Sequence, residues 1–576
     1  MKLNVDIFPY DLNVFIKGTY KIKNKSNKPI DSVLVNISSE LKINKLEFTS
    51  GAKIVLEDKD NGFYIYRLNK TMMPNDSTIF TMELSDITKG FSNSGNNASA
   101  DYNGTFLNSF MLPHFGYIES DELSDDNARR KQGLPPKERV PNLRDTTQWK
   151  VNQITADADW ITYEATVSTA SDQIAISPGY LEKEWTESDR RYFHYKMDAK
   201  ILNFYCFLSA RYEVKRDKWN APDKSGQVVN IEIYYHKGHE YNVDRMIYAI
   251  KKSLDYYTKN FSPYQYRQIR ILEFPRHAIF AQSFPNTIPY SEGIGFIADI
   301  DETDPDDINY PLYVTAHEVA HQWWAHQVIG ANVQGAGIIV ETMAEYSALM
   351  VMEHEYGKET MKKFLKYEMN NYLRGRSHER KKEMPMLTAE EQQYIHYNKG
   401  SVIMYALKDY IGEDSLNSAM KKYIKAAAYR DNPYTTSIEF IDYIRKATPD
   451  SLKHIITDMF EKITLFENRV LEAGYKKTKD GKYIVEFTVE AKKIVADSLG
   501  NETEIPINDW IDIAVLSKTK DKKGNSINKE LYFVKRKIDK SKMKFEITVD
   551  EVPIEVGIDP YNKLIDRHPD DNTKKI

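Results

Sequence analysis

Hydrophobic positions follow a period of two along the first part of this chain. From residue 3 to about residue 235, apolar residues alternate with polar ones in short runs, such as Leu3, Val5 and Ile7. Clusters of turn-forming residues separate these runs. Such alternation is typical of strands with one buried face, so this part is predicted to be an antiparallel β domain.

The period changes to that of a helix near residue 241 and changes back near residue 464. Helical spacing dominates between these points, apart from strand segments predicted near 269–274 and 293–300. The alternation that follows predicts strands of a small β-sandwich.

The length of the chain supports a division into several domains. It has 576 residues, whereas single hydrophobic cores stop growing at about 250 to 300 residues. We predict a multidomain α+β protein with a β domain at 1–236, a mostly helical domain at 237–460 and a β-sandwich at 461–576. The composition is 41% hydrophobic and 28% charged with a net charge of −5. Nothing in that balance predicts a nucleic-acid partner.

Few features of the sequence bear on its compartment. Cys206 is the single cysteine, which excludes an intrachain disulfide. No run reaches the roughly 18 apolar residues of a membrane span, and the N-terminus lacks the apolar core of a signal peptide. The chain as given is therefore expected to be soluble. The segment 92–104 is rich in Ser, Asn and Gly and is expected to be a mobile loop.

The helical region contains the motif H-E-x-x-H. Residues four apart on a helix share a face, so His317 and His321 can each present a ring nitrogen to one metal ion. Glu318 follows the first histidine and can take a proton from a water beside the metal. The motif lies in an apolar helical run without proline, which strengthens it. These residues predict metal-assisted hydrolysis.

A catalytic zinc site needs a third protein ligand, and two carboxylates are candidates. Between Gln322 and Val340 there is no acidic residue, and glycines interrupt the helical pattern. A second helix then carries Glu341 and, one turn later on the same face, Glu345. Either could bind the metal. We favour Glu341 as the ligand and Glu345 as the residue that orients a ligand.

The motif H-E-x-x-H-Q-W-W, followed by E-x-x-A-E-Y, resembles the gluzincin aminopeptidases, the family of aminopeptidase N and leukotriene hydrolase. That family usually has eighteen residues between the second histidine and the glutamate, whereas this chain has nineteen. We interpret the extra residue as an insertion in the glycine-containing turn. The resemblance implies one zinc ion per chain, an N-terminal β-saddle, a thermolysin-like catalytic domain and a C-terminal β-sandwich.

Two further residues are implied by the resemblance. The family's G-x-M-E-N segment, whose glutamate binds the free amine of the substrate, has no direct match, but Glu292 lies twenty-five residues before His317, within the family's range. The alternative for Glu292 is a solvated turn residue. Tyr397, in the string Y-x-K-G fifty-six residues after Glu341, corresponds to the tyrosine that stabilises the oxyanion.

These residues predict a zinc aminopeptidase that hydrolyses the N-terminal peptide bond of peptides. The alternatives are an endopeptidase, an epoxide hydrolase on the same zinc, or a non-catalytic peptide-binding or sensor domain. The strings H-Q-W-W-A-H and S-E-G-I-G-F most resemble bacterial membrane proteins in which transporter-permease-like helices precede the peptidase. We therefore also expect an association with membrane transporter-like segments outside this chain.

Overall fold

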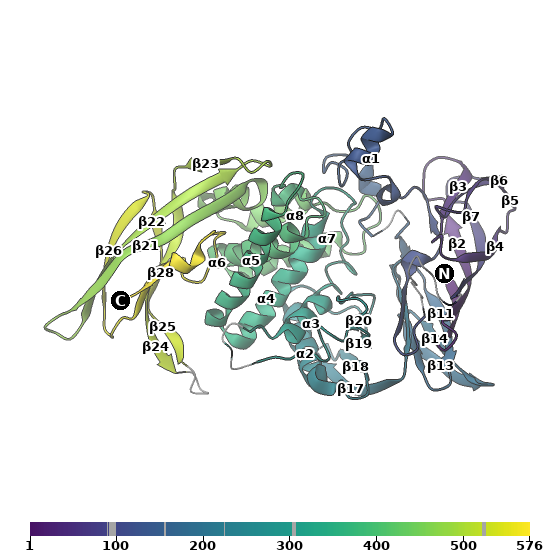
Figure 1. The fold of residues 1–576 in the computed structure, drawn as a ribbon, viewed down its shortest axis with the longest axis horizontal. Helices are drawn as coiled ribbons and strands as arrows, with labels where there is room; N and C mark the ends of the chain where they lie inside the picture. The colour runs from purple at the N-terminus through teal and green to yellow at the C-terminus, as the bar shows by residue number, and fades with distance from the viewer. Residues whose placement is uncertain are drawn as a thin grey trace.

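The protein is described by a computed structural model covering residues 1–88, 90, 100–154, 157–223, 225–301, 304, 307–520 and 526–576. Sheets at the N-terminal end, helices in the middle and sheets at the C-terminal end follow one another along the longest axis (Figure 1). This arrangement confirms the predicted multidomain α+β class. Most of the loop expected at 92–104 lies outside the described residues.

The N-terminal part is built on a seven-stranded sheet in which only β1 and β11 run parallel. Leu3, Val5 and Ile7 of β1 are buried, as their alternation predicts. The sheet order is β13 (Tyr180–Glu187), β14 (Arg190–Lys196), β11 (Glu164–Ala170), β1 (Lys2–Phe8), β2 (Asn13–Lys23), β7 (Ser77–Ile87) and β4 (Lys42–Phe48).

Three smaller sheets complete this part. One contains β5 (Ala52–Asp58), β6 (Phe63–Met72), β3 (Ile30–Asn36) and β9 (His114–Phe115). Another contains β12 (Ile174–Ile176), β16 (Cys206–Ala210) and β8 (Thr105–Asn108), and a third pairs β10 (Trp160–Ile161) with β15 (Ile201–Leu202).

A four-stranded sheet forms one side of the central part. It contains β17 (Tyr212–Asn220), β18 (Val228–His236), β19 (Gln268–Phe274) and β20 (Thr287–Ser291). The last three strands are parallel, and α2 (Val243–Asn260) connects β18 to β19. Because β18 pairs with β19, this sheet crosses the domain boundary predicted at residue 236.

The prediction of a strand at 293–300 is wrong. The chain turns there, closed by a hydrogen bond from the Ile297 N–H to the Glu292 carbonyl (3.0 Å). Gly295 packs so closely on Tyr290 that an added Cβ would lie 2.4 Å from its ring. Gly295 thus permits a tight turn after β20 in place of the extended strand that the sequence predicts.

Helices fill the rest of the central part. α3 (Tyr310–Ala320) packs against both α2 and α4 (Met343–Tyr356), with Trp323 and Trp324 fully buried just beyond its end. The others are α5 (Met361–Ser377), α6 (Gly400–Ile411), α7 (Glu413–Ala427), α8 (Ser437–Ala447) and α9 (Lys453–Ile456), while the short α1 (Asp126–Lys131) belongs to the N-terminal part. Within the described residues, no helix is long and apolar enough to cross a membrane.

The C-terminal part consists of two sheets that bury an apolar interior between them. The first contains β21 (Ile463–Lys477), β22 (Tyr483–Ala496), β23 (Glu502–Ile505) and β26 (Lys542–Val549). The second contains β25 (Ser526–Ile538), β24 (Asp509–Lys520), β27 (Glu555–Ile558) and β28 (Thr573–Lys575).

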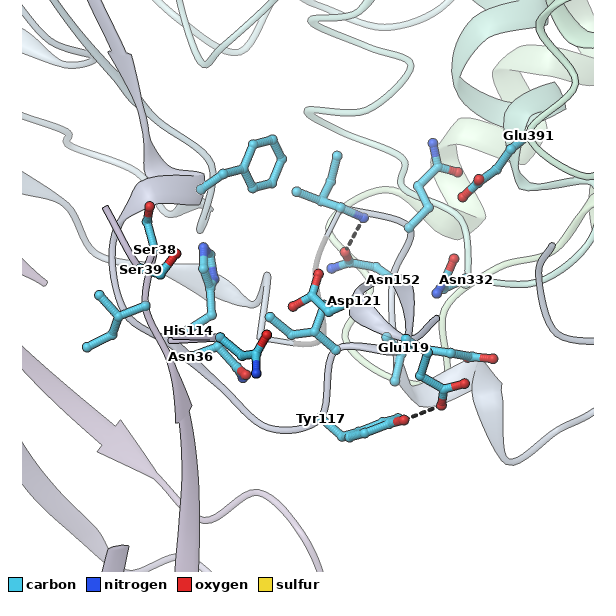
Figure 2. A pocket seen from close by; sticks show the side chains of 18 of the residues that line it. Asn36, Ser38, Ser39, His114, Tyr117, Glu119, Asp121, Asn152, Asn332 and Glu391 are labelled. Atoms are coloured by element: carbon cyan, nitrogen blue, oxygen red, sulfur yellow. Dashed lines mark hydrogen bonds between the residues drawn. The ribbon is translucent and has the colours of Figure 1, made fainter. Parts of the chain in front are cut away.

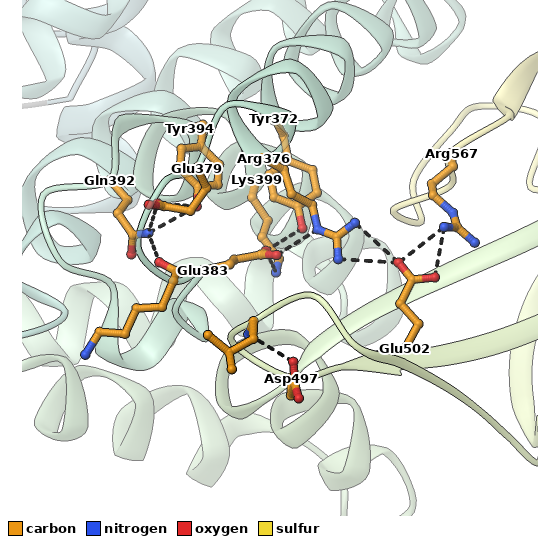
Figure 3. A network of polar contacts seen from close by, with 12 residues as sticks. Tyr372, Arg376, Glu379, Glu383, Gln392, Tyr394, Lys399, Asp497, Glu502 and Arg567 are labelled. Atoms are coloured by element: carbon orange, nitrogen blue, oxygen red, sulfur yellow. Dashed lines mark hydrogen bonds and ion pairs between the residues drawn. The ribbon is translucent and has the colours of Figure 1, made fainter.

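A polar network connects the C-terminal part to the helical part (Figure 3). Glu383 accepts a hydrogen bond from Arg376 Nε (2.7 Å), and its other oxygen lies 3.5 Å from Lys399 Nζ. Arg376 also reaches Glu502 of β23 (3.4 Å), which in turn pairs with Arg567 (2.9 Å). Burial lowers the pKa of Lys399. The network therefore links β23 to the end of the π-helical turn η8 (Tyr394–Lys399).

Candidate active site

The two histidines of the motif lie at the end of a buried helix. α3 begins at a side-chain cap, where Asn309 Oδ1 accepts from the Leu312 N–H (3.3 Å), and Pro311 occupies its first turn. His317 is in the last turn and His321 is the residue that ends the helix. Tyr257 donates to the Ala316 carbonyl (2.9 Å) and fixes the helix against α2. All these contacts hold the histidines on a rigid element.

Three donor atoms converge beside this helix. His317 Nε2 and His321 Nε2 lie 2.9 Å apart, and they lie 3.5 and 3.4 Å from Oε2 of Glu341. Tetrahedral zinc with bonds of about 2.0 to 2.2 Å places its ligand atoms about 3.3 to 3.6 Å apart. Oε2 of Glu341 is buried, and it has no hydrogen-bond partner among the described residues. The two histidine–carboxylate distances lie in this range and the histidine–histidine distance is shorter. The donor types, two imidazoles and one carboxylate, are those of zinc, the predicted cofactor.

Contacts at the far side of each imidazole orient the donors. His321 Nδ1 lies 3.0 Å from the Trp324 carbonyl, which leaves Nε2 as the lone-pair nitrogen. His317 Nδ1 lies 3.1 Å from Oε1 of Glu345. The Tyr313 hydroxyl donates to Oε2 of the same glutamate. Carboxylates in this position are typical partners of zinc-binding histidines.

Glu318 and Tyr397 border the donor triangle. Glu318 is 5% exposed, and its Oε2 has no hydrogen-bond partner in the described part of the chain. Burial raises the pKa of this carboxyl group. The Tyr397 ring stacks on the His317 ring at 5.9 Å, and burial raises its pKa far above the usual value. The phenol therefore remains a hydrogen-bond donor at neutral pH.

Two π-helical turns deliver the residues from outside the motif. Glu341 lies in η5 (Ile338–Thr342), and Tyr397 lies in η8. Thr342 Oγ1 donates to the His396 carbonyl (2.5 Å), which joins the two turns directly. A Cβ at Gly337 would lie 2.8 Å from the His396 ring, so this approach requires glycine. Such turns occur frequently at functional sites.

A family model for the peptidase family M1 domain matches residues 245–460. Residues 245–460 are a peptidase family M1 domain. This match confirms the predicted gluzincin family for residues 245–460 and supports the predicted metallopeptidase class. The M1 domain contains all three donors together with Glu318 and Tyr397.

Known proteins are similar to this chain in sequence or in fold. The chain is 25% identical over 213 residues to human endoplasmic reticulum aminopeptidase 2, a match that covers 35% of the chain and 22% of the human protein. The M1 zinc metallopeptidase of Deinococcus radiodurans superposes with a TM-score of 0.52 at 10% identity, covering 80% of this chain and 92% of its own. Aminopeptidase A of Legionella pneumophila superposes with a TM-score of 0.58 at 15% identity. This match covers 98% of this chain and 58% of the Legionella chain. The predicted link to transporter-like segments stays a prediction.

Glu292 lies outside the group formed by the other predicted site residues. Its Oε2 lies 3.9 Å from His239 Nδ1, and its Oε1 accepts from the Arg276 N–H (3.2 Å). The structure groups it with His236, His239 and Glu273, whereas His317, His321 and Glu341 form a separate group. The amine-binding role predicted for Glu292 stays a prediction, and the carboxylate has other partners.

A segment that the sequence analysis did not predict to be part of the site, residues 280–284, lies next to the C-terminal end of α3. Residues 280–284 run antiparallel to β20 through bridges at Ala281 and Phe284. Gln322, directly after His321, donates to Ser283 Oγ (2.5 Å) and to the Phe284 carbonyl (3.0 Å). Pro285 and Asn286, a turn signal with φ of 51° at the asparagine, could have revealed this hairpin.

A large cavity lies between the N-terminal part and the M1 domain (Figure 2). Its volume is about 980 Å³, and Glu119, Asp121 and Glu391 contribute acidic groups to its wall. Asn332 and Glu391 supply the M1 side and belong to the loops that precede η5 and η8. Two residues of the cavity wall are therefore close in sequence to Glu341 and Tyr397. Neither Glu341 nor Tyr397 is among the described residues that line the cavity.

Proposed function

We propose that this protein is a zinc-dependent aminopeptidase that releases the first residue of peptides. The observation that carries the proposal is the convergence of two imidazoles and one carboxylate, with Glu318 and Tyr397 beside them. The M1 domain match supports it, and two of the similar proteins are named aminopeptidases. A binding module would not require Glu318 or Tyr397.

Each residue has a defined task in this proposal. His317, His321 and Glu341 would hold the zinc ion, which when bound supplies Lewis-acid polarisation of a carbonyl and a water. Glu318 removes a proton from the attacking water and returns it to the leaving amine. Its Oε2, which has no hydrogen-bond partner in the part of the chain that the structure describes, is available for that proton.

Tyr397 donates a hydrogen bond to the oxygen of the scissile carbonyl as negative charge develops there. Its hydroxyl remains protonated because burial raises its pKa, and η8 holds it at a fixed place beside His317. A donor that is already oriented stabilises the transition state without reorganisation.

An endopeptidase is the second candidate, and one observation favours it. Cleavage at the first peptide bond needs a group that recognises the free amine, and a carboxylate is the natural partner of an ammonium ion. The edge segment 280–284 next to the zinc helix has the sequence F-A-Q-S-F without a carboxylate. Glu292, the predicted partner of the amine, contacts His239 and Arg276 instead.

Matched peptides with a free or an acetylated N-terminus separate the two candidates. We expect the zinc-loaded protein to release the first residue of the free peptide only, and Glu318→Gln to abolish release while zinc content stays unchanged. Glu187→Gln, at an exposed position of β13, controls for the substitution itself. Internal cleavage of both peptides would establish an endopeptidase, and the absence of hydrolysis by the zinc-loaded protein would contradict both candidates.

A further inference from the structure

A second group of metal-ligating side chains lies at one edge of the central sheet. β18, β19 and β20 are parallel, so their carboxyl ends meet at the same edge. His236 is the last residue of β18, Glu273 is the second-last residue of β19, and Glu292 directly follows β20. His239 follows β18 by three residues, in a turn closed by its N–H bonding to the His236 carbonyl (2.9 Å). The carboxyl edge of parallel strands is where open α/β sheets bind ligands.

The four side chains are close enough to share one ion. One potential ligand atom from each lies within 4.8 Å of those of the other three. His239 Nδ1 contacts Oε1 of Glu273, and His236 Nδ1 lies 3.4 Å from the same oxygen. Oε2 of Glu292 lies 3.9 Å from His239 Nδ1. The separations of 3.4 and 3.9 Å leave room for an ion between the groups, whereas His239 and Glu273 are in direct hydrogen-bond contact.

Burial makes this arrangement costly without a cation at its centre. Glu273 is fully buried, and a buried carboxylate needs strong compensation. His236 is nearly buried as well, and its Nδ1 faces the same carboxylate at 3.4 Å.

Other contacts orient the two carboxylates as ligands. The His236 N–H donates to Oε2 of Glu273 (2.6 Å), which leaves Oε1 directed at the histidines. The Arg276 N–H donates to Oε1 of Glu292 (3.2 Å), which leaves Oε2 on the side of His239. Each carboxylate therefore has one oxygen fixed by the backbone and one oxygen facing the cluster.

We propose that His236, His239, Glu273 and Glu292 bind a second divalent transition-metal ion, for which zinc is the best match. Two imidazoles and two carboxylates suit zinc, whereas calcium prefers six to eight oxygen ligands. The ion would connect the ends of three strands and the turn that leads into α2. The proposal is independent of the proposed peptidase activity, because it concerns a separate group of ligands.

Metal stoichiometry tests the proposal directly. The protein is dialysed against zinc, freed of loosely bound metal on a desalting column, and its zinc content is measured by mass spectrometry. We expect two zinc ions per wild-type chain and one in His239→Asn. The affinity of the second site for zinc should be at least about 100-fold weaker in His239→Asn than in the wild type. His317→Gln/His321→Gln should also keep one ion, and the triple variant should keep none.

The controls separate metal binding from folding and from surface histidines. His354 pairs with Glu413 (3.0 Å) at the protein surface, so His354→Asn should keep two ions. Glu292→Gln, at a less buried position than Glu273, repeats the test if His239→Asn does not fold. Cobalt absorbance of the His317→Gln/His321→Gln variant should show histidine-ligated Co²⁺ and should disappear in Glu292→Gln on that background. One zinc ion in the wild type, or a second ion that persists in folded His239→Asn or Glu292→Gln, would overturn the proposal.

Discussion

The M1 domain and the adjoining strands contain two groups of histidine and glutamate with different surroundings. The first group, His317, His321 and Glu341, is carried by α3 and a π-helical turn. The second group, which includes His239 and Glu273, lies at the ends of parallel strands. The ligand types are the same, so the ligands alone do not distinguish a catalytic centre from a structural one.

The difference lies in the groups beside the ligands. Glu318 and Tyr397 border the first group. Glu318 has an oxygen without a hydrogen-bond partner in the described residues, and the Tyr397 hydroxyl stays protonated because burial raises its pKa. In the second group, Oε2 of Glu273 accepts from the backbone and Oε1 faces the histidines, so both oxygens serve the cluster itself. Catalysis needs a base and a donor that are free to act on substrate, and these accompany the first group.

The largest contrast should come from the same substitution made in each group. His321→Gln removes a ligand of the catalytic group, so we expect kcat/KM for a free-amine peptide to fall by more than about 10³-fold, the combined loss of metal and acid–base assistance. His239→Gln should cause a decrease at least a hundredfold smaller. Steady-state kinetics at saturating zinc measure both, and equal losses would contradict the assignment of catalysis to the first group.

Removing one hydroxyl should produce the next largest effect. Tyr397→Phe keeps the ring that stacks on His317 but deletes the donor to the oxyanion. We expect kcat to fall by about 10²- to 10³-fold, as for other oxyanion donors, with little change in KM or zinc content. Tyr405→Phe, in the nearby helix α6, is the matched control. A loss confined to KM would contradict a role in the transition state.

The local parts of the catalytic group could be predicted from sequence. His317 and His321 lie four residues apart at the end of one helix, so their spacing alone places them on one face, with Glu318 next to the first. The sequence predicts that the one extra residue between His321 and Glu341 lies in the glycine-containing turn. The structure has a π-helical turn at 338–342, and such a turn can take up one residue more than an α-helical turn.

The second group could not be predicted, because pairing of distant strands assembles it. His236, Glu273 and Glu292 come together only when β18, β19 and β20 pair in parallel. The prediction for Glu292 used only its distance along the sequence from His317, and that distance contains no information on the hairpin at 284–287. The same hairpin brings Ser283 beside the zinc helix.

Glu345 should affect the affinity of the first group more than its chemistry. Its carboxylate lies 3.1 Å from His317 Nδ1 and orients that imidazole. We expect Glu345→Gln to weaken zinc binding about 10- to 100-fold, the usual range for such partners, and to recover most of its kcat at high zinc. Titration with a zinc-buffered chelator measures the affinity. A kcat that stays low at saturating zinc would assign Glu345 a direct part in the reaction.

The smallest expected effect is a change in thermal stability caused by zinc binding to the second group alone. The variant His317→Gln/His321→Gln lacks two ligands of the first group, so zinc should bind to the second group. Binding there should stabilise the folded state. A ligand at about 100 times its dissociation constant contributes about 2.7 kcal/mol, and for a domain of 150 to 250 residues this raises Tm by roughly 5 to 10 °C. Thermal unfolding with and without zinc should show this shift, and adding His239→Gln should remove it. Magnesium, which prefers six oxygen ligands, should leave Tm unchanged. A zinc-induced shift that survives His239→Gln would mean that the ion binds elsewhere, and the two groups would then differ in metal binding as well as in catalysis.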